Sequence, residues 1–253
     1  MAHYLSIESK RRSAGFSLVE LSIVLVIIGL IVSSVLVGQD LVRSAELRAL
    51  ASQYEEFNKA AATFRDKYSG LPGDVRADVR FGFGVAEAGT TEDGLLEDAA
   101  GNYSLHSGEY TRFWNHLGGS GAGLIPESYA GGAVHSADIS TILPQSEQGG
   151  YWGTFSLSTG ENYFIYGAAD NGSSAAWYTE NILSPKDMLS IDSKIDDGRP
   201  GRGILRARGQ NATNPLTNPG AGAALCVSAA GADGDYNVDL NDPLCTFSVL
   251  MRI

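Results

Sequence analysis

The sequence predicts an α+β fold in which one long N-terminal helix is followed by a head of short strands, short helices and loops. Two observations predict the helix: residues 16–37 are almost uniformly apolar, and apolar side chains then recur at helical spacing as far as Tyr68. A third observation predicts a sheet, because residues 151–168 contain two strand-like runs separated by Thr159 and Gly160. A chain of 253 residues, 43% of them hydrophobic, can bury a sizeable core.

The apolar run at residues 16–37 is long enough to span a bilayer as a helix. Basic residues at positions 10–12 precede it and are expected to stay on the cytoplasmic side, so the rest of the chain is expected outside the cytoplasm. An ordinary secretory signal has its small-residue cleavage site after the apolar run, whereas Ala14 and Gly15 come before it here. The pattern therefore predicts a membrane anchor.

Glu20 is the one charged residue within this run, and no further charge follows until Asp40. A carboxylate in a membrane helix is costly and normally marks a partner or a function. Glu20 is therefore expected to pair with a cation. The alternative is a plain signal anchor in which Glu20 is an incidental interfacial residue.

Beyond the apolar run the helix is predicted to continue as an amphipathic segment. Its end is expected at residues 70–74, Gly-Leu-Pro-Gly-Asp, because glycine can cap a helix and proline cannot continue it. Aromatic residues in the apolar stripe suit packing on a sheet better than the narrow seam of a coiled coil, which is the alternative. The stripe consists of Leu47, Leu50, Tyr54, Phe57, Ala61, Phe64 and Tyr68.

The head is predicted to contain a β-hairpin, further strands and two short helices. Ser184 and Pro185 suit the N-cap and first position of a helix that ends before Asp196. Residues 75–107 are weakly patterned, and residues 210–224 are predicted to form a surface loop. The expected strands are residues 151–158, 162–168, 203–208 and 246–253, and the other expected helix is residues 109–117.

The two cysteines, Cys226 and Cys245, have 18 residues between them and no metal-ligand spacing. In an oxidising compartment they are expected to form a disulfide, which would stabilise the head by roughly 3 kcal/mol. Two buried free thiols are the alternative.

The stretch comprising Gly15, Phe16, Ser-Leu-Val and Glu20 resembles the type IV prepilin signature. In that family a prepilin peptidase cleaves after the glycine, the new N-terminal residue is N-methylated, and the fifth mature residue is a glutamate. The resemblance implies that the free amine of Phe16 supplies the cation for Glu20, within one subunit or between neighbours. It also implies a pilin-like fold, with the second half of the helix lying across an antiparallel sheet. The implied divisions are a leader at 1–15, a transmembrane and assembly half at 16–40, an amphipathic half at 41–69 and a head with a C-terminal disulfide loop at 70–253.

The resemblance implies a structural subunit without catalytic activity or cofactor. The subunit would be a single-pass inner-membrane precursor in a bacterium, with its head in the periplasm, and would then enter an extracellular pilus or a periplasmic pseudopilus. The implied partners are prepilin peptidase, membrane lipid before assembly, an inner-membrane assembly platform, and copies of the chain or other pilin-like subunits. The head is large for a major pseudopilin, which favours a type IV pilus over a type II secretion pseudopilus. A membrane-tethered adhesin, binding module or enzyme is a further alternative, and it predicts a pocket of convergent polar groups in the head.

One departure from the best-known class of pilins is Val37, which stands where those proteins have a proline in the membrane helix. Gly29 and Gly38 would have to loosen the helix instead. Two further segments, Leu-Pro-Gly-Asp at 71–74 and Ile-Asp-Ser-Lys-Ile-Asp-Asp-Gly at 191–198, resemble a subgroup of prepilin-like proteins. They do not identify the filament.

Other kinds of site receive little support from the sequence. The formal charge of −11 argues against a general nucleic-acid binder. The histidines His3, His106, His116 and His135 form no metal-binding motif, and the glycine-rich residues 118–123 lack catalytic spacing. An irregular calcium site remains an alternative, either at Asp233, Asp235, Asn237 and Asp239 or at Asp196 and Asp197.

Overall fold

The computed structural model describes residues 17–84, 90–97, 108–132, 139–156, 160–168, 181–208, 225–228 and 234–253. The chain divides into two compact units, Met1–Ala45 and Glu46–Ile253. Helix α1, Leu18–Tyr68, contributes residues to both units. The expected leader at 1–15 lies outside the described residues, so the proposed division into leader, anchor and head stays a prediction.

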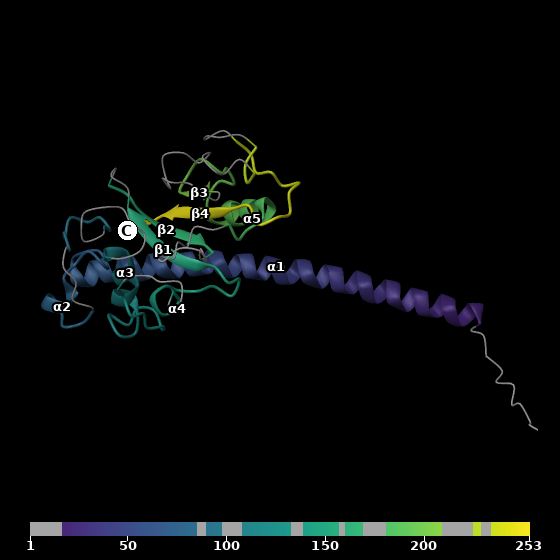
Figure 1. The fold of residues 1–253 in the computed structure, drawn as a ribbon, viewed down its shortest axis with the longest axis horizontal. Coiled ribbons are helices and arrows are strands. Elements are labelled where there is room, and N and C mark those ends of the chain that lie inside the picture. Colours follow the sequence, from purple (N-terminus) through teal and green to yellow (C-terminus); the bar gives the residue numbers. More distant parts are fainter. Residues whose placement is uncertain are drawn as a thin grey trace, which may run out of the picture. The chain divides into compact units, whose positions relative to one another are not determined.

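The second unit is built around a four-stranded antiparallel sheet with strand order β1-β2-β4-β3 (Figure 1). The hairpin of β1 and β2 pairs Tyr151 with Gly167 and Ser156 with Asn162. The C-terminal strand β4 lies between β2 and β3. The strands are β1 Tyr151–Ser156, β2 Asn162–Gly167, β3 Leu205–Arg208 and β4 Thr246–Leu250.

The part of α1 that belongs to this unit packs on the sheet. Tyr54 and Phe57 contact Phe164 of β2, with ring centroids 6.1 and 6.4 Å apart. The Tyr54 hydroxyl donates to the Leu250 carbonyl at 3.1 Å, and the Arg252 amide donates to the Asn58 side-chain oxygen at 2.8 Å. These contacts confirm the predicted α+β fold with a long helix and an antiparallel sheet, and they favour the sheet-packed helix over a coiled-coil seam.

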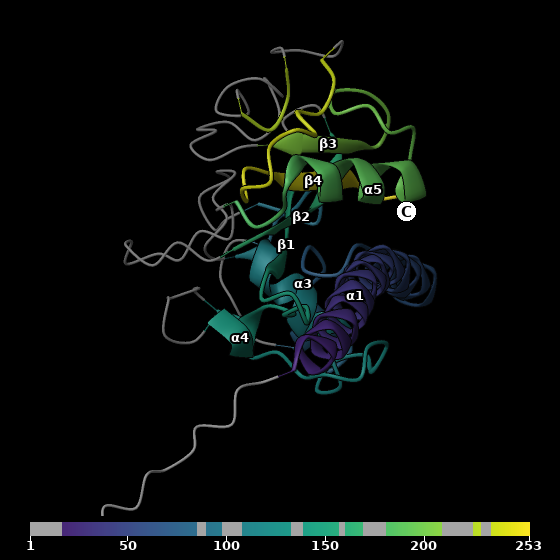
Figure 2. The same cartoon turned by 90° about the vertical axis from the view of Figure 1, so that its right-hand side faces the viewer.

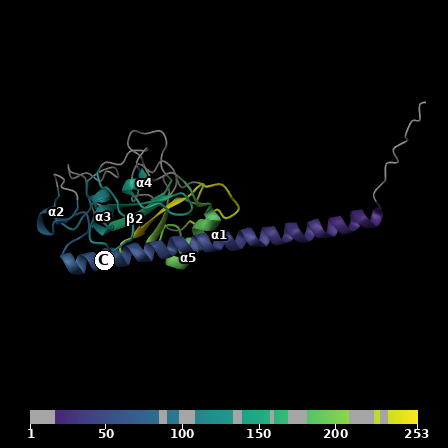
Figure 3. The same ribbon diagram turned by 90° about the horizontal axis from the view of Figure 1, so that it is seen from below.

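The remaining helices surround the sheet within the same unit. Helix α3 lies beside α1, as Figures 1 and 3 show, and Trp114 packs edge-on against Phe57 with centroids 4.8 Å apart. Helix α5 lies beside β3 at the edge of the sheet (Figure 2). These helices are α2 Ala77–Arg80, α3 Glu109–Leu117, α4 Ile139–Ile142 and α5 Pro185–Ile195.

The predicted helices at 109–117 and after Ser184 are confirmed with the expected ends, and the Asp187 amide donates to the Ser184 hydroxyl at 3.2 Å. The strands are shorter than predicted. β1 ends at Ser156, with residues 157–159 outside the described part, and β2 ends at Gly167. β3 begins at Leu205, after a turn that includes Gly203 at φ +68°; the Ile204 carbonyl still accepts from the Leu250 amide, but the Ile204 amide donates to Asp196. β4 ends at Leu250, after which the Met251 amide still donates to the Asn162 carbonyl at 2.9 Å and the Arg252 amide donates to Asn58 of α1.

The end of α1 differs in detail from the expectation of a glycine cap. Ser69 takes the left-handed conformation at φ 56°, and its amide donates to the Arg65 carbonyl at 2.8 Å. Gly70 is needed for another reason, since a Cβ there would collide with Val75. The residue that caps the helix was therefore predicted one position too late.

The Leu-Pro-Gly-Asp turn that follows α1 is held by buried polar groups. The Gly73 amide donates to Nδ1 of His116 at 2.9 Å, and a Cβ at Gly73 would meet the backbone of Glu109. Asp74 accepts hydrogen bonds from the amides of Asp93 and Gly94 at 3.2 and 2.9 Å. The turn therefore joins the end of α1 to α3 and to the loop at residues 90–97.

Candidate functional site

The N-terminal part of α1, which belongs to the first unit, presents an apolar surface without intramolecular cover. Every large apolar side chain from Leu18 to Val42 is between 50% and 85% exposed. An 18-residue window of this helix has a mean hydropathy of 2.8 and is long and apolar enough to cross a membrane. A surface of this size is not stable in water, so lipid or other apolar helices must cover it.

Two serines within this segment, Ser22 and Ser34, are satisfied by the helix itself. The Ser22 hydroxyl donates to the Val19 carbonyl at 2.8 Å, and the Ser34 hydroxyl donates to the Leu30 carbonyl at 2.8 Å. Because an unpaired hydroxyl is costly in hydrocarbon, these bonds allow both serines to lie in an apolar environment. The helix runs through Gly29, Val37 and Gly38 as one element.

Glu20 occupies the first turn of α1 and forms a capping box with Ser17. The Ser17 amide donates to Oε2 of Glu20 at 2.8 Å, and the Val19 amide donates to the Ser17 hydroxyl at 3.3 Å. Both bonds satisfy amide groups that have no carbonyl partner at a helix start. Sequence reasoning missed this role, although the signal was present as Ser-Leu-Val-Glu at 17–20.

The predicted cleavage and methylation positions, Gly15 and Phe16, lie outside the described residues. The pairing of Glu20 with the amine of Phe16 is therefore a prediction that the geometry does not test. Glu20 does lie in the first turn of α1.

The disulfide between Cys226 and Cys245 is present, with the two Cα atoms 5.3 Å apart. Both cysteines are fully buried. Cys245 immediately precedes β4 and forms an isolated bridge with Leu183, while the Cys226 carbonyl accepts a hydrogen bond from the Asn237 amide at 3.0 Å. The bond therefore ties the C-terminal loop to the start of the last strand.

The acidic groups considered as calcium ligands fall into two places. Asp192, Asp196 and Asp197 bring carboxylate oxygens within 4.8 Å of one another at the end of α5. Two of them already have structural partners, because Asp192 accepts from the Tyr236 hydroxyl at 2.7 Å and Asp196 accepts from the amides of Ile204 and Leu205. Burial raises the pKa of Asp192 to about 7, although the hydrogen bond from Tyr236 opposes this.

The second candidate calcium site, at residues 233–239, forms no comparable group of carboxylates in the described part of the chain. Asp233 lies outside the described residues. The side-chain nitrogen of Asn237 donates to the Leu225 carbonyl at 3.0 Å and so holds the disulfide loop. His116 is a satisfied core residue, since it is buried and its Nδ1 accepts the Gly73 amide. Burial, followed by the nearby Arg112 charge, lowers its pKa to about 4. His3, His106 and His135 lie outside the described residues.

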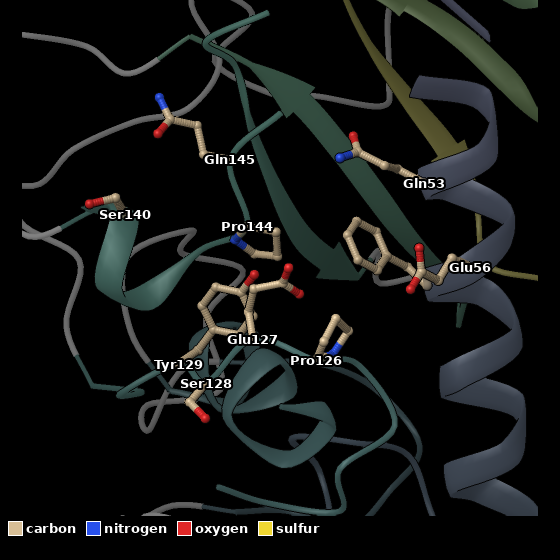
Figure 4. Close-up of a pocket in the computed structure, with 10 residues that line it drawn as sticks. Gln53, Glu56, Pro126, Glu127, Ser128, Tyr129, Ser140, Pro144 and Gln145 are labelled. Carbon is tan, nitrogen blue, oxygen red and sulfur yellow. The ribbon is translucent and has the colours of Figure 1, made fainter. Parts of the chain in front are cut away.

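The head also contains a polar pocket, which the binding-module alternative predicts (Figure 4). Its volume is about 420 Å³, and α1 forms one side of it with Gln53, Glu56 and Phe57. The other side comes from the segment after α3 and from α4 with the residues that follow it. The residues on that side are Pro126, Glu127, Ser128, Tyr129, Ser140, Pro144 and Gln145.

Comparison with known proteins finds one similarity, and it falls on the N-terminal segment. The family model of the prokaryotic N-terminal methylation motif matches residues 10–36. No curated protein and no solved structure matches the chain. The matched residues include the start of α1, Glu20 and most of its exposed apolar surface. The chain thus carries the N-terminal methylation motif of type IV prepilin-like proteins, on a long helix and an antiparallel sheet consistent with a pilin-like fold.

Proposed function

We propose that this chain is a structural subunit of a type IV pilus-like filament. It is made as a prepilin, cleaved after Gly15, N-methylated at Phe16 and assembled through the exposed half of α1. The observation that carries this proposal is that the methylation motif coincides with an apolar helix that no other described residue of its unit covers. Lipid covers this helix in the precursor, and the helices of neighbouring subunits cover it in the filament.

Glu20 has a specific role in this proposal. In the precursor its carboxylate accepts the Ser17 amide, so it is already oriented at the helix start. Cleavage after Gly15 creates a cationic amine at Phe16, one helical turn from Glu20. In an apolar environment, two paired charges have a much lower free energy than two isolated charges. An incoming helix is therefore held at the position where its charges meet those of a neighbour.

Processing is tested by the intact mass of the protein extracted from membranes of its native host. The expected mass corresponds to loss of residues 1–15 and addition of one methyl group. A mature protein that retains the leader, or one whose first residue is not Phe16, contradicts the proposal.

Assembly is tested by replacing Glu20 in two ways. Glu20→Ala removes both the charge and the acceptor for the Ser17 amide, whereas Glu20→Gln keeps an acceptor and removes only the charge. The ion-pair role predicts that both variants are cleaved but fail to form filaments. If Glu20→Gln assembles normally, Glu20 acts only as a helix cap. Asp40→Asn, another exposed acidic residue of α1, is the matched control and should assemble.

The type of filament is a separate question, and we propose a pilus subunit with a type II secretion pseudopilin as the alternative. In either case the precursor is a single-pass inner-membrane protein with its head in the periplasm, and its partners are prepilin peptidase, an assembly platform and pilin-like subunits. Deleting the chain in its host distinguishes the two. Loss of filaments sheared from the cell surface supports the pilus, and loss of protein export with surface filaments intact supports the pseudopilus.

The absence of catalytic activity is part of the proposal. The methylation motif indicates a structural protein. The pocket of Figure 4 is the observation that favours the tethered binding module or enzyme. If a chain with Glu20→Ala retained its biological role without assembling, the tethered function would replace the structural one.

A further inference from the structure

The pocket on the head is a formed site whose walls are fixed by contacts outside it. On α1, Gln53, Glu56 and Phe57 are spaced three and four residues apart and so share one helix face. The Trp152 indole donates to the Gln53 side-chain oxygen at 3.0 Å, which orients that amide. Phe57 is held edge-on by Trp114. The α1 side of the pocket is therefore anchored to the core of the head.

The opposite wall is tied down through its backbone. The Gly119 amide donates to the Glu127 carbonyl at 2.8 Å, and the Asn115 side chain donates to the Tyr129 carbonyl at 2.6 Å. The Ala130 amide donates to the Thr141 carbonyl at 2.8 Å, which joins this wall to α4. The wall is thus connected both to the end of α3 and to α4.

The polar groups that face this pocket are mostly acceptors without partners. Glu56 and Glu127 enter from opposite walls (Figure 4), and neither carboxylate has an ion pair or hydrogen bond in the described part of the chain. Tyr129 is only 6% exposed and lines the pocket, and its hydroxyl has no hydrogen-bond partner among the described residues. Glu56, Glu127 and Tyr129 all line the same pocket (Figure 4). Burial, followed by the charges of Glu127 and Glu56, raises the pKa of Tyr129, so its hydroxyl stays protonated.

From this arrangement we propose that the pocket binds an organic cation, an ammonium or guanidinium group carried on an apolar stem. Two carboxylates and a hydroxyl accept hydrogen bonds from its N–H groups, and the charge of the ligand offsets that of Glu56 and Glu127. Phe57, Pro126 and Pro144 give the stem an apolar wall. This site goes beyond filament assembly through the exposed part of α1, because all of its lining residues belong to the second unit, Glu46–Ile253.

Two sources can supply this chemistry, a lysine or arginine side chain of a neighbouring protein subunit or a free small amine. The wide mouth suits either source, since Glu56, Glu127 and Gln145 are exposed to solvent. The two sources share the recognition chemistry and differ only in what the stem is attached to.

The site is tested with n-butylammonium as the probe and the full chain in detergent micelles, by saturation-transfer NMR of the probe. We expect a dissociation constant on the order of millimolar, weakening with salt. Glu56→Gln and Glu127→Gln should each weaken binding about two- to fivefold, which is the range for exposed charge pairs. Tyr129→Phe should have a smaller effect. Glu55→Gln, on the same helix but not lining the pocket, is the matched control and should change nothing.

The proposal is overturned if 1-butanol, which is neutral, binds as well as n-butylammonium, or if Glu55→Gln weakens binding as much as Glu127→Gln. A zero-length carbodiimide then identifies the source in assembled filaments, because it joins carboxylates to lysine amines in direct contact. A cross-link from Glu56 or Glu127 to a lysine of another subunit identifies the protein source. Binding of the probe without such a cross-link identifies an arginine or a free amine.

Discussion

The two halves of α1 form one continuous helix with opposite surroundings. In the first unit, large apolar side chains of this helix are at least half exposed, whereas in the second unit its apolar stripe is buried. Leu25 and Leu50 illustrate the difference, with 69% and 1% of their side chains exposed. Helix formation is therefore independent of what covers each half.

The two halves of α1 lower the free energy through different contacts, one within the chain and the other with lipid or other subunits. The half beginning at Glu46 stabilises the head through contacts within the chain, such as Phe57 with Trp114 and Tyr54 with Leu250. The earlier half contributes nothing to that core, so its apolar residues are retained for interactions with lipid or other subunits. Mutations in the half before Glu46 should therefore leave the stability of the head unchanged. Mutations in the half that begins at Glu46 should leave the interactions of the earlier half with lipid or other subunits unchanged.

The largest effect is expected from the matched substitutions Leu50→Ala and Leu25→Ala. Leu50→Ala removes a buried side chain and leaves a cavity, which should lower the free energy of unfolding of the head by about 2–5 kcal/mol. Leu25→Ala should change it by less than about 0.5 kcal/mol. Urea unfolding of the full chain in micelles, followed by tryptophan fluorescence, measures both. Equal losses would remove the distinction between the halves.

Loss of the disulfide should act on the head alone. Replacing both Cys226 and Cys245 by serine opens a loop with a sequence separation of 19. The free energy of unfolding should fall by about 3 kcal/mol in the chain-entropy treatment. The same urea experiment measures this loss, and flotation of membranes measures anchoring, which should not change. Release of the variant from the membrane would show that the head and the anchor are not independent.

The sequence predicted the long helix and the disulfide because each depends on a local or compositional signal. The stripe from Leu47 to Tyr68 repeats over several turns, and the helix after Ser184 has a serine N-cap followed by proline. The order of the strands was not predictable, since β4 enters between β2 and β3 through pairings between residues distant in sequence. The pocket was not located either, because it combines α1 with residues 126–145, which carry no shared sequence pattern.

A smaller effect, again confined to the head, is expected from pH. Burial raises the pKa of Glu109 to about 7, although the amides of Thr91 and Glu97 oppose this by donating to it at 2.9 and 2.8 Å. The folded head therefore binds a proton that the unfolded chain releases above pH 4.5. This contribution to stability is present at low pH and is lost as pH rises through about 7.

Glu109 and Asp192 both contribute in the window from about pH 6.5 to 8, and the change in slope made by Glu109→Gln identifies the share of Glu109. His116, whose pKa falls from 6.5 to about 4 on folding, acts in the opposite direction but at lower pH. The pKa of Asp192 is also raised by burial, so its contribution to stability falls with rising pH, as that of Glu109 does. We expect the melting temperature of the head to fall across this window, and Glu109→Gln to flatten the slope, whatever its effect on stability itself. Glu55→Gln, an exposed acidic residue of α1, is the control, and a slope unchanged by Glu109→Gln would contradict the assignment.

The smallest effect concerns the first turn of α1. Ser17→Ala removes the hydroxyl that accepts the Val19 amide but leaves the Ser17 amide bonded to Glu20. Loss of an N-cap costs about 1 kcal/mol, so local opening should increase about fivefold. Hydrogen exchange of the Val19 amide in the micelle-bound precursor measures this. Ser22→Ala is the matched control, because its hydroxyl donates to a carbonyl and caps nothing.

The same variant distinguishes the two roles of Glu20. If Ser17 holds the helix start in register, Ser17→Ala should slow filament formation in proportion to the local opening and leave cleavage intact. If the charge of Glu20 alone determines assembly, Ser17→Ala should assemble at the normal rate despite faster exchange at Val19. Unchanged exchange at Val19 would mean that Ser17 does not cap this helix in the membrane, and the orientation of Glu20 would then depend on its partner alone.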